Sequence, residues 1–377
     1  MKFFTMCMRV VSTIVFVLSE ILEFITGLTT RKNKFFSALG FFTLAYTAGV
    51  INPGPAMSYD YPLYATFYNA GSNYFEKGYS DFALFALQHG LSYEEFRYIF
   101  SIIAIVILYW GVARFTNNMA LFISLYGCTV FFYDAVQIRN LMMISLVILG
   151  SSFLIDLSIK NIAISTALIL FSAQFHTSGY FFLLIILVRI LPKKIIKRSL
   201  YVVICVTILL TVIVSFTGTE VLTTLLTKPL NLIIGGRASL GDKLVGQYNY
   251  GSPVPKLITI IISTTCALIV QNIYFTSSGS NEEFKKQQIL FSAMITAVLG
   301  LPLLLLAIDY SRIQRNAVLF ILIGISLFFE QDKVEFKKNK ISIVMWSVFV
   351  FALNVWAQIY IWGFQFQEII PYLIKVK

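Results

Sequence analysis

Charged residues are scarce in this chain of 377 residues. They make up 12% of the sequence, whereas soluble domains carry about a quarter. Hydrophobic residues make up 58%, and the mean hydropathy is +0.80. Apolar runs of the roughly 20 residues that cross a bilayer recur from one end of the chain to the other. The composition excludes a soluble protein and predicts an all-α, multi-pass membrane protein that forms one domain over residues 1–377.

Cysteine and histidine are scarce as well. The four cysteines lie far apart inside apolar segments, which excludes a disulfide framework and a thiolate metal site. The two histidines are also distant from each other and cannot supply the usual ligand spacing of a zinc site. We therefore expect no metal and no cofactor.

The net charge of +11 comes from lysines and arginines beside apolar runs, as the positive-inside rule expects, so we predict no nucleic-acid partner. The densest clusters, "RKNK" (31–34) and "LPKKIIKRS" (191–199), are assigned to the cytoplasmic side. An even number of crossings must separate them, which requires two short segments in 161–191, broken at "HTSG". The whole chain then has about twelve crossings, and the long loops 52–97 and 218–256 face the extracytoplasmic side.

The first outer loop has the pattern of short interfacial helices. Tyr61, Tyr64 and Tyr68 recur at helical intervals, and we expect them at the level of the lipid headgroups. "DFALFALQHG" predicts an apolar helix that ends near Gly90, with His89 as a capping residue. "SYEE" predicts a capping box between Ser92 and Glu95 at the start of the next span.

Ionisable residues near membrane depth are costly and therefore candidates for function. His176 lies at the outer end of the predicted break, where an imidazole could act as a base or a hydrogen-bond donor, or simply bond a neighbouring helix. Glu20 and Glu23 share one face of the first helix, and packing explains them as well as function does. Asp60 and Glu76 are the best carboxylates in the outer loop, with solvated loop charges as the alternative.

Three arginines fall in two predicted outer turns. Arg139 either pairs with Asp134 to close its turn or belongs to an anion site together with Arg312 and Arg315. Guanidinium groups suit a diphosphate because their planar donors meet phosphate oxygens bidentately. Arg237 and Lys243 in the second outer loop are weaker phosphate candidates. The segment "GRASLGDK" there does not match a phosphate loop, because no lysine and hydroxyl residue follow its second glycine directly.

Five segments occur in an order that is similar to the EpsG-like group of Wzy-type polysaccharide polymerases, over about residues 40–330. These bacterial multi-pass proteins act in capsule, exopolysaccharide and O-antigen assembly. The segments are "YDYPLY" around Asp60, "YFEKGYSDFAL" around Glu76, "QIRNLMMIS" around Arg139, "FHTSGYFFL" around His176 and "SRIQRNAVLF" around Arg312. The chain departs from the usual family pattern in lacking an arginine shortly before Asp60 and in carrying Asn140 where a glutamine is usual.

The resemblance implies a glycosyltransferase of the bacterial cell membrane, metal-independent and inverting, with its active site facing the extracytoplasmic side. Its substrate would be a glycan repeat unit on a polyprenyl diphosphate such as undecaprenyl diphosphate. The growing chain would pass to the non-reducing end of another lipid-linked unit. Partners would be this lipid-linked oligosaccharide, the bilayer and a chain-length regulator. The expected roles are Asp60 or His176 as base with Glu76 as runner-up, Arg139 and Arg312 on the diphosphate with Arg315 in support, and Tyr61 and Tyr64 along the sugar path.

Two other functions remain open on the sequence. One is a flippase or transporter of lipid-linked oligosaccharide, and the other is a membrane glycan ligase or acyltransferase. Transporters often carry internal repeats with charges near the midplane. The sequence shows no such repeat, and its polar candidates gather on the predicted outer side. Both observations favour the polymerase.

Overall fold

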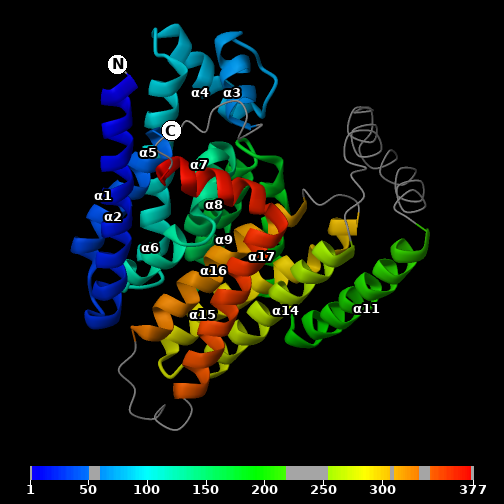
Figure 1. Ribbon diagram of the computed structural model, residues 1–377. Coiled ribbons are helices and arrows are strands. Elements are labelled where there is room, and N and C mark those ends of the chain that lie inside the picture. The colour runs from blue at the N-terminus through cyan, green and yellow to red at the C-terminus, as the bar shows by residue number, and fades with distance from the viewer. Residues whose placement is uncertain (1, 51–59, 218–253, 306–309, 331–339, 375–377) are drawn as a thin grey trace.

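A computed structural model of the protein describes residues 2–50, 60–217, 254–305, 310–330 and 340–374 (Figure 1). Every regular element in these residues is a helix, which confirms the predicted all-α class. The first half contains α1 (Lys2–Thr29), α2 (Lys34–Val50), α3 (Asp60–Asn69), α4 (Lys77–Gln88), α5 (Tyr93–Ala113), α6 (Met119–Gly127), α7 (Phe131–Val136) and α8 (Ile138–Ser152). The second half contains η1 (Phe153–Ile155), α9 (Ile159–Ser172), η2 (Thr177–Leu183), α10 (Leu184–Ile190), α11 (Lys193–Thr217), α14 (Val254–Thr276), α15 (Asn281–Leu299), η4 (Leu301–Leu305), α16 (Ser311–Phe329) and α17 (Lys340–Ile374).

Six segments are long and apolar enough to span a bilayer, so the chain is a multi-pass membrane protein. Three further apolar helices in the described residues are shorter than these six. The count of about twelve crossings stays a prediction. The six segments are Tyr93–Ala113, Ile138–Ile155, Lys194–Ile213, Val254–Thr276, Asn281–Leu304 and Ser311–Phe329. The shorter ones are Ile159–Ser172, Thr177–Ile190 and Ile341–Ala357.

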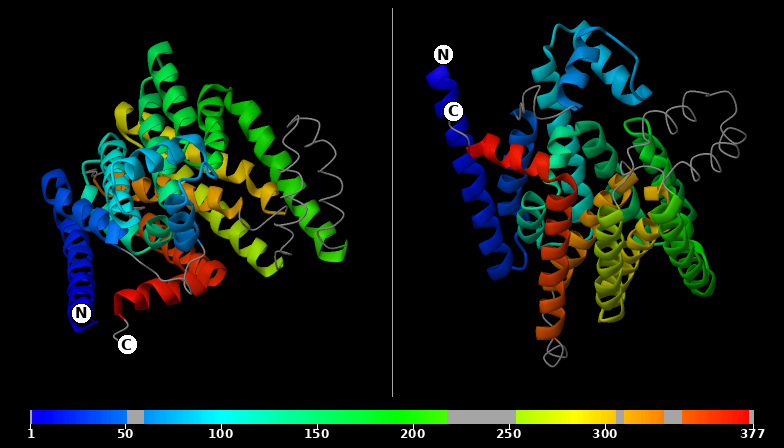
Figure 2. Two further views of the ribbon diagram at one scale, coloured as in Figure 1. Left: turned by 90° about the horizontal axis from the view of Figure 1, so that it is seen from above. Right: turned by 45° about the vertical axis from the view of Figure 1, so that its right-hand side comes forward.

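Helix α5 packs between α2 and α8 and forms the centre of the N-terminal half. A Cβ at Gly111 of α5 would lie 2.9 Å from the backbone nitrogen of Leu149, so only glycine permits this close approach to α8. Helices α3 and α4 lie beyond one end of the bundle, over the start of α5 (Figures 1 and 2). We refer to this end of the bundle as the α3–α4 end.

The opposite end is held by buried amides. Asn33, in the turn between α1 and α2, donates from Nδ2 to Oδ1 of Asn118 at 2.9 Å. Asn118 in turn donates to the carbonyl of Gly27 at 2.9 Å. Glu330, at the end of α16, accepts from the backbone N–H of Asn117 at 2.7 Å. These bonds join three helix connections whose own polar groups would otherwise be buried without partners.

The predicted features of the first outer loop are confirmed in part. Helix α4 is followed by Gly90 with a φ of +76°, a conformation that favours glycine, and Ser92 and Glu95 form the capping box. His89 is the C-cap of α4, and its Nδ1 lies 2.7 Å from the carbonyl of Phe85. Tyr61, Tyr64 and Tyr68 are buried against neighbouring side chains, and their expected position at the level of the lipid headgroups stays a prediction.

Helix breaks differ from the predicted spans in two places. The span expected over 119–133 is divided, because α6 ends at Gly127 and the short α7 follows. The arginines expected in an outer turn, Arg312 and Arg315, lie instead in the first two turns of α16. The predicted break near His176 is confirmed, since α9 ends at Ser172 and η2 begins at Thr177.

Candidate functional site

Glu76 joins three segments that are far apart in the sequence. It is the N-cap of α4, and one of its carboxylate oxygens forms an ion pair with Arg139, the second residue of α8. The other oxygen accepts the backbone N–H of Thr177 at 3.1 Å, at the start of η2. The start of α4 is thereby fixed to the starts of α8 and η2.

Arg139 lies in a nearly closed aromatic box. Its Cζ is 4.2 Å from the ring centroid of Phe75, 5.4 Å from that of Tyr64 and 5.7 Å from that of Tyr79. Its side chain is only 11% exposed, and that of Glu76 is 15% exposed. Aromatic faces stabilise the desolvated guanidinium, and the carboxylate balances its charge.

The alternative pairing of Arg139 with Asp134 is wrong. Asp134 is fully buried and accepts from the hydroxyl of Tyr126 at 2.9 Å and from Nδ2 of Asn140 at 3.0 Å. Asn140 also exchanges hydrogen bonds with Asn316 of α16. Asp134 therefore belongs to a buried network that joins α7, α8 and α16, while Arg139 points towards α4.

His176 contacts a second arginine. Its Nε2 lies 3.2 Å from Nη1 of Arg312, and its Nδ1 lies 2.7 Å from Oγ and 3.2 Å from the backbone nitrogen of Ser178. A guanidinium has only donors, so Nε2 must accept from Arg312. A neutral imidazole then carries its proton on Nδ1, where it can be donated to Oγ of Ser178. In this tautomer Nδ1 does not accept the backbone N–H of Ser178, although the geometry directs that N–H at it.

The environment keeps His176 neutral. Burial, followed by the charges of Arg312, Arg139 and Arg315, holds the pKa of the imidazole well below its ordinary value of 6.5. An imidazole with a depressed pKa is a weak proton acceptor at neutral pH. Its clearest contribution in this structure is to hold Arg312.

Asp60 is linked to a third arginine through Gln137. Nε2 of Gln137 donates to Oδ2 of Asp60 at 2.7 Å, and Oε1 of Gln137 accepts from Nη2 of Arg315. Gln137 lies at the break between α7 and α8, where its side chain reaches both α3 and α16. No other hydrogen bond to Asp60 occurs in the described residues, so Oδ1 is available to a ligand.

The two arginines of α16 differ in depth. Arg315 is buried, with its Cζ 5.3 Å from the ring centroid of Tyr133, and its charge lies near Asp134. Arg312 is half-buried, and Nε of each arginine has no partner among the described residues, so the two differ in exposure rather than in this atom. Arg312 is therefore the better placed of the two for an external anion, whereas Arg315 orients Gln137.

Tyr61 and Tyr64 present no open ring face. Tyr64 packs against Phe75 and Tyr79, and Tyr61 packs against Tyr93. Burial, and next the charge of Asp60, raise the pKa of the Tyr64 hydroxyl, while Arg139 and Arg312 oppose this shift. The Tyr64 hydroxyl is thus close to the charged groups of the site, and contact with a sugar would involve hydroxyls rather than stacking.

Arg97 and Gln137 were missed by the sequence reasoning. Arg97 of α5 is buried, donates to the carbonyls of Ala48 and Ala135, and lies with its Cζ 4.9 Å from the ring centroid of Tyr61. An arginine inside an apolar span was the available signal for it. The only sequence signal for a role of Gln137 was its position two residues before Arg139.

Other candidates lie elsewhere. Glu20 and Glu23 of α1 are buried against Gly127 and Gly40, and the charge of Glu20 acts on Cys128 rather than on the site. Arg237 and Lys243 lie outside the described residues. The described residues contain no group of three or more histidines, cysteines and carboxylates able to hold a metal ion.

Comparison with known proteins gives one result. The sequence matches the model of the EpsG family over residues 34–374, which is nearly the whole chain. No curated protein and no solved structure matches it. The match includes every site residue described above, and the chain belongs to the EpsG family.

Proposed function

We propose that the protein is a polymerase of lipid-linked glycan repeat units. Membership in the EpsG family and the multi-pass fold support this class of function. The observation that carries the proposal is the convergence of Arg139, Arg312, His176, Glu76 and Asp60 at the α3–α4 end. These residues come from five separate segments.

The reaction requires one base and one set of cations. A hydroxyl of the acceptor sugar attacks the anomeric carbon of the donor, and the bond from that carbon to the diphosphate oxygen breaks. The hydroxyl proton passes to the base, and the bond electrons leave with the lipid diphosphate. Fixed guanidinium groups lower the energy of this developing anion.

Arg312 is proposed as the principal diphosphate ligand. Its Nε is unpartnered, and its only hydrogen bond in the described residues is to the neutral His176. Arg139 contributes positive potential from its aromatic box, where Glu76 already pairs with it. Arg315 supports through Gln137.

Asp60 is proposed as the base in preference to His176 and Glu76. The Nε2 lone pair of His176 is occupied by Arg312, and both oxygens of Glu76 are bonded. Among the described residues, Asp60 is held through Oδ2 alone. A single base with a single leaving group is consistent with one in-line displacement, which inverts the anomeric centre and requires no metal.

The site is proposed to face the extracytoplasmic side of the bacterial cell membrane, where polyprenyl-linked repeat units are polymerised. At the opposite end, Lys285 and Lys286 pair with carboxylates near the start of α15, and Lys34 donates to the carbonyl of Ala113. Basic residues at that end fit a cytoplasmic location.

The test is polymer formation by protein reconstituted with its cognate lipid-linked repeat unit, with the products resolved on a gel. We expect a ladder with wild type and single units with Arg139→Ala and Arg312→Ala. The matched control is Arg114→Ala, because Arg114 lies at the opposite end and bonds Ser152. A full ladder from both site variants would refute the assigned roles. Transport of the unit without a ladder would indicate a flippase, and product on another acceptor would indicate a ligase.

A further inference from the structure

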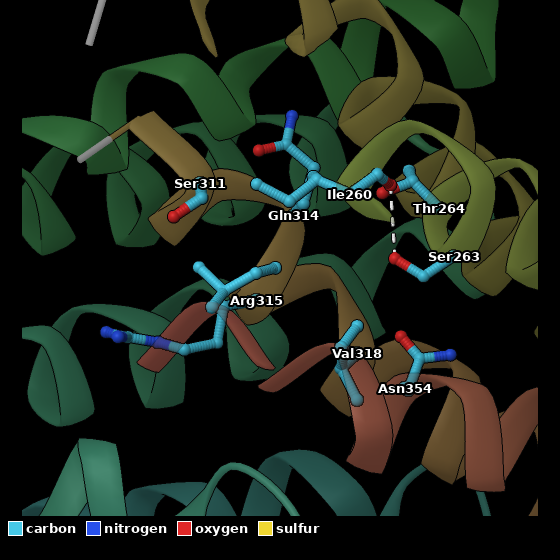
Figure 3. Close-up of a pocket in the computed structure, with 10 residues that line it drawn as sticks. Ile260, Ser263, Thr264, Ser311, Gln314, Arg315, Val318 and Asn354 are labelled. Carbon is cyan, nitrogen blue, oxygen red and sulfur yellow. Dashed lines mark hydrogen bonds between the residues drawn. The ribbon is translucent and has the colours of Figure 1, made fainter. Parts of the chain in front are cut away.

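A polar pocket lies between α14, α16 and α17 (Figure 3). It is separate from the Arg139–Glu76 pair, although Arg315 borders it. The residues that line it are Ile260, Ser263, Thr264, Ser311, Gln314, Arg315, Val318, Asn354, Ala357 and Ile361. Hydroxyl and amide side chains thus gather where three helices of a membrane bundle would ordinarily pack apolar surfaces.

Three atoms of the lining residues lack hydrogen-bond partners within the described residues, namely Oγ of Ser311, Oε1 of Gln314 and Nε of Arg315. Oγ of Ser311 and Oε1 of Gln314 are buried and unpartnered, and these two residues are 4% and 6% exposed. Nε2 of Gln314 donates to the carbonyl of Ala297 at 3.0 Å, which fixes the amide and leaves Oε1 as the vacant acceptor. Buried polar atoms are nearly always paired, so this pair requires an occupant that carries a donor and an acceptor.

Two of the other polar lining residues already form hydrogen bonds. Ser263 donates to the carbonyl of Ile260 at 3.1 Å, the bond drawn in Figure 3. Asn354 donates to the carbonyl of Val350 at 2.8 Å. The unpartnered buried atoms of the lining therefore all lie on the side of the pocket formed by the first two turns of α16.

The chemistry of the lining selects a neutral hydroxyl. Arg315 is the only charged residue in the lining, and its guanidinium points away from Ser263 and Asn354 towards the side where it bonds Gln137 (Figure 3). A phosphate would meet too little positive charge, and an isoprenoid chain would leave Ser311 and Gln314 unpaired. The space admits a hydroxyl or hydroxymethyl group rather than a whole sugar ring.

Arg315 relates this pocket to the proposed reaction. It separates the pocket from Gln137, which in turn holds Asp60. A sugar hydroxyl beside Ser311 would thus be connected to the proposed base, Asp60, through the side chains of Arg315 and Gln137. We propose that the pocket is a carbohydrate subsite that recognises one hydroxyl or hydroxymethyl group of a neutral sugar in the lipid-linked substrate. The substrate class rests on the proposed function.

Ser311→Ala is the direct kinetic test, because Oγ of Ser311 has no hydrogen-bond partner to lose among the described residues. The variant should fold normally and raise the KM for the lipid-linked unit about tenfold, the value of one hydrogen bond, with kcat little changed. Ser326→Ala is the matched control on α16, since Ser326 is buried and bonds the carbonyl of Leu322. An unchanged KM in Ser311→Ala would overturn the subsite.

A binding test separates this proposal from the polymerase assignment. In full-length protein whose native cysteines are replaced by alanine, Ser311→Cys is treated with a small, water-soluble methanethiosulfonate reagent. The repeat-unit saccharide, released from its lipid by mild acid, should slow the reaction about tenfold, and inorganic pyrophosphate should not. Protection by pyrophosphate alone would make the pocket an anion site, and no protection would leave it a water site; either result overturns the proposal. Protection by saccharide without any polymer ladder in wild type would retain the subsite and reject the polymerase.

Discussion

Replacement of Gln137 by glutamate should reveal which group is the base. The glutamine amide donates to Asp60 and accepts from Arg315, and glutamate has the same shape. In Gln137→Glu, Arg315 favours the charged form of the new carboxylate. A second carboxylate then faces Asp60 at the former hydrogen-bond distance of 2.7 Å, where two adjacent carboxylates resist ionising together. Asp60 therefore keeps a proton to higher pH.

The size of this effect follows from the geometry. Two unit charges about 4 Å apart repel by about 4 kcal/mol at an effective dielectric constant of about 20. Each pH unit corresponds to about 1.4 kcal/mol, so the acidic limb of the pH–rate profile should move upward by about two to three units. The assay is polymer formation in proteoliposomes from pH 4 to pH 9.

The neutral variant Gln137→Met is the control. It removes both hydrogen bonds and should lower the rate, but it adds no charge and should not move the acidic limb upward. If Gln137→Glu remains active with the acidic limb of wild type, Asp60 is not the base. His176 does not contact Gln137 in the described residues, so the two candidates give different profiles.

Further predictions concern stability and metal dependence. Glu76→Ala should lower the free energy of unfolding by about 3 to 5 kcal/mol, because it leaves Arg139 buried without its carboxylate. Glu76→Gln keeps an acceptor for the backbone N–H of Thr177 and should therefore lower it less. Thermal unfolding in detergent measures both effects. The pKa of His176 is lower in the folded than in the unfolded protein, so stability should be full above about pH 6.5 and fall as the pH drops below it. His176→Gln should flatten this decline, and equal slopes in both proteins would contradict the depressed pKa of His176. Asn118→Ala, at the opposite end, should lower the melting temperature without changing the KM of the protein that remains folded. Addition of a chelator should leave the rate unchanged, and loss of polymer on chelation would disprove the metal-free reaction.

The fold class could be predicted because it depends on composition. Long apolar runs must satisfy their backbone hydrogen bonds internally in a bilayer, and helices do this within one segment. The local breaks were also readable, since Gly90, the Ser92–Glu95 capping box and the polar residues after His176 act through neighbours in sequence. Periodicity placed α3 but could not say which way its tyrosines face.

The partners of the site residues could not be predicted in this way. The pairing of Arg139 with Glu76 depends on how α4 lies over α8, and the pairing of Arg312 with His176 depends on how α16 lies beside η2. Asp134 was a plausible partner for Arg139 because it is near in sequence, but the helical geometry of α7 and α8 directs the two side chains apart. Local spacing fixes the elements, whereas tertiary packing decides between candidates on different elements.

Helix starts explain why a cluster of charged side chains can exist at the α3–α4 end of the bundle. Asp60 is the first residue of α3, Glu76 caps α4, Gln137 caps α8, His176 caps η2, and Arg312 follows the first residue of α16. The first turn of a helix leaves backbone N–H groups unpaired and carries partial positive charge, which favours anions there. The two carboxylates are stabilised at such positions in the absence of substrate. An incoming diphosphate would meet the same partial charges together with the guanidinium of Arg312, so the helix breaks supply the electrostatic field that the leaving group needs. By this argument, the proposed reaction requires a chain path that is broken at the α3–α4 end.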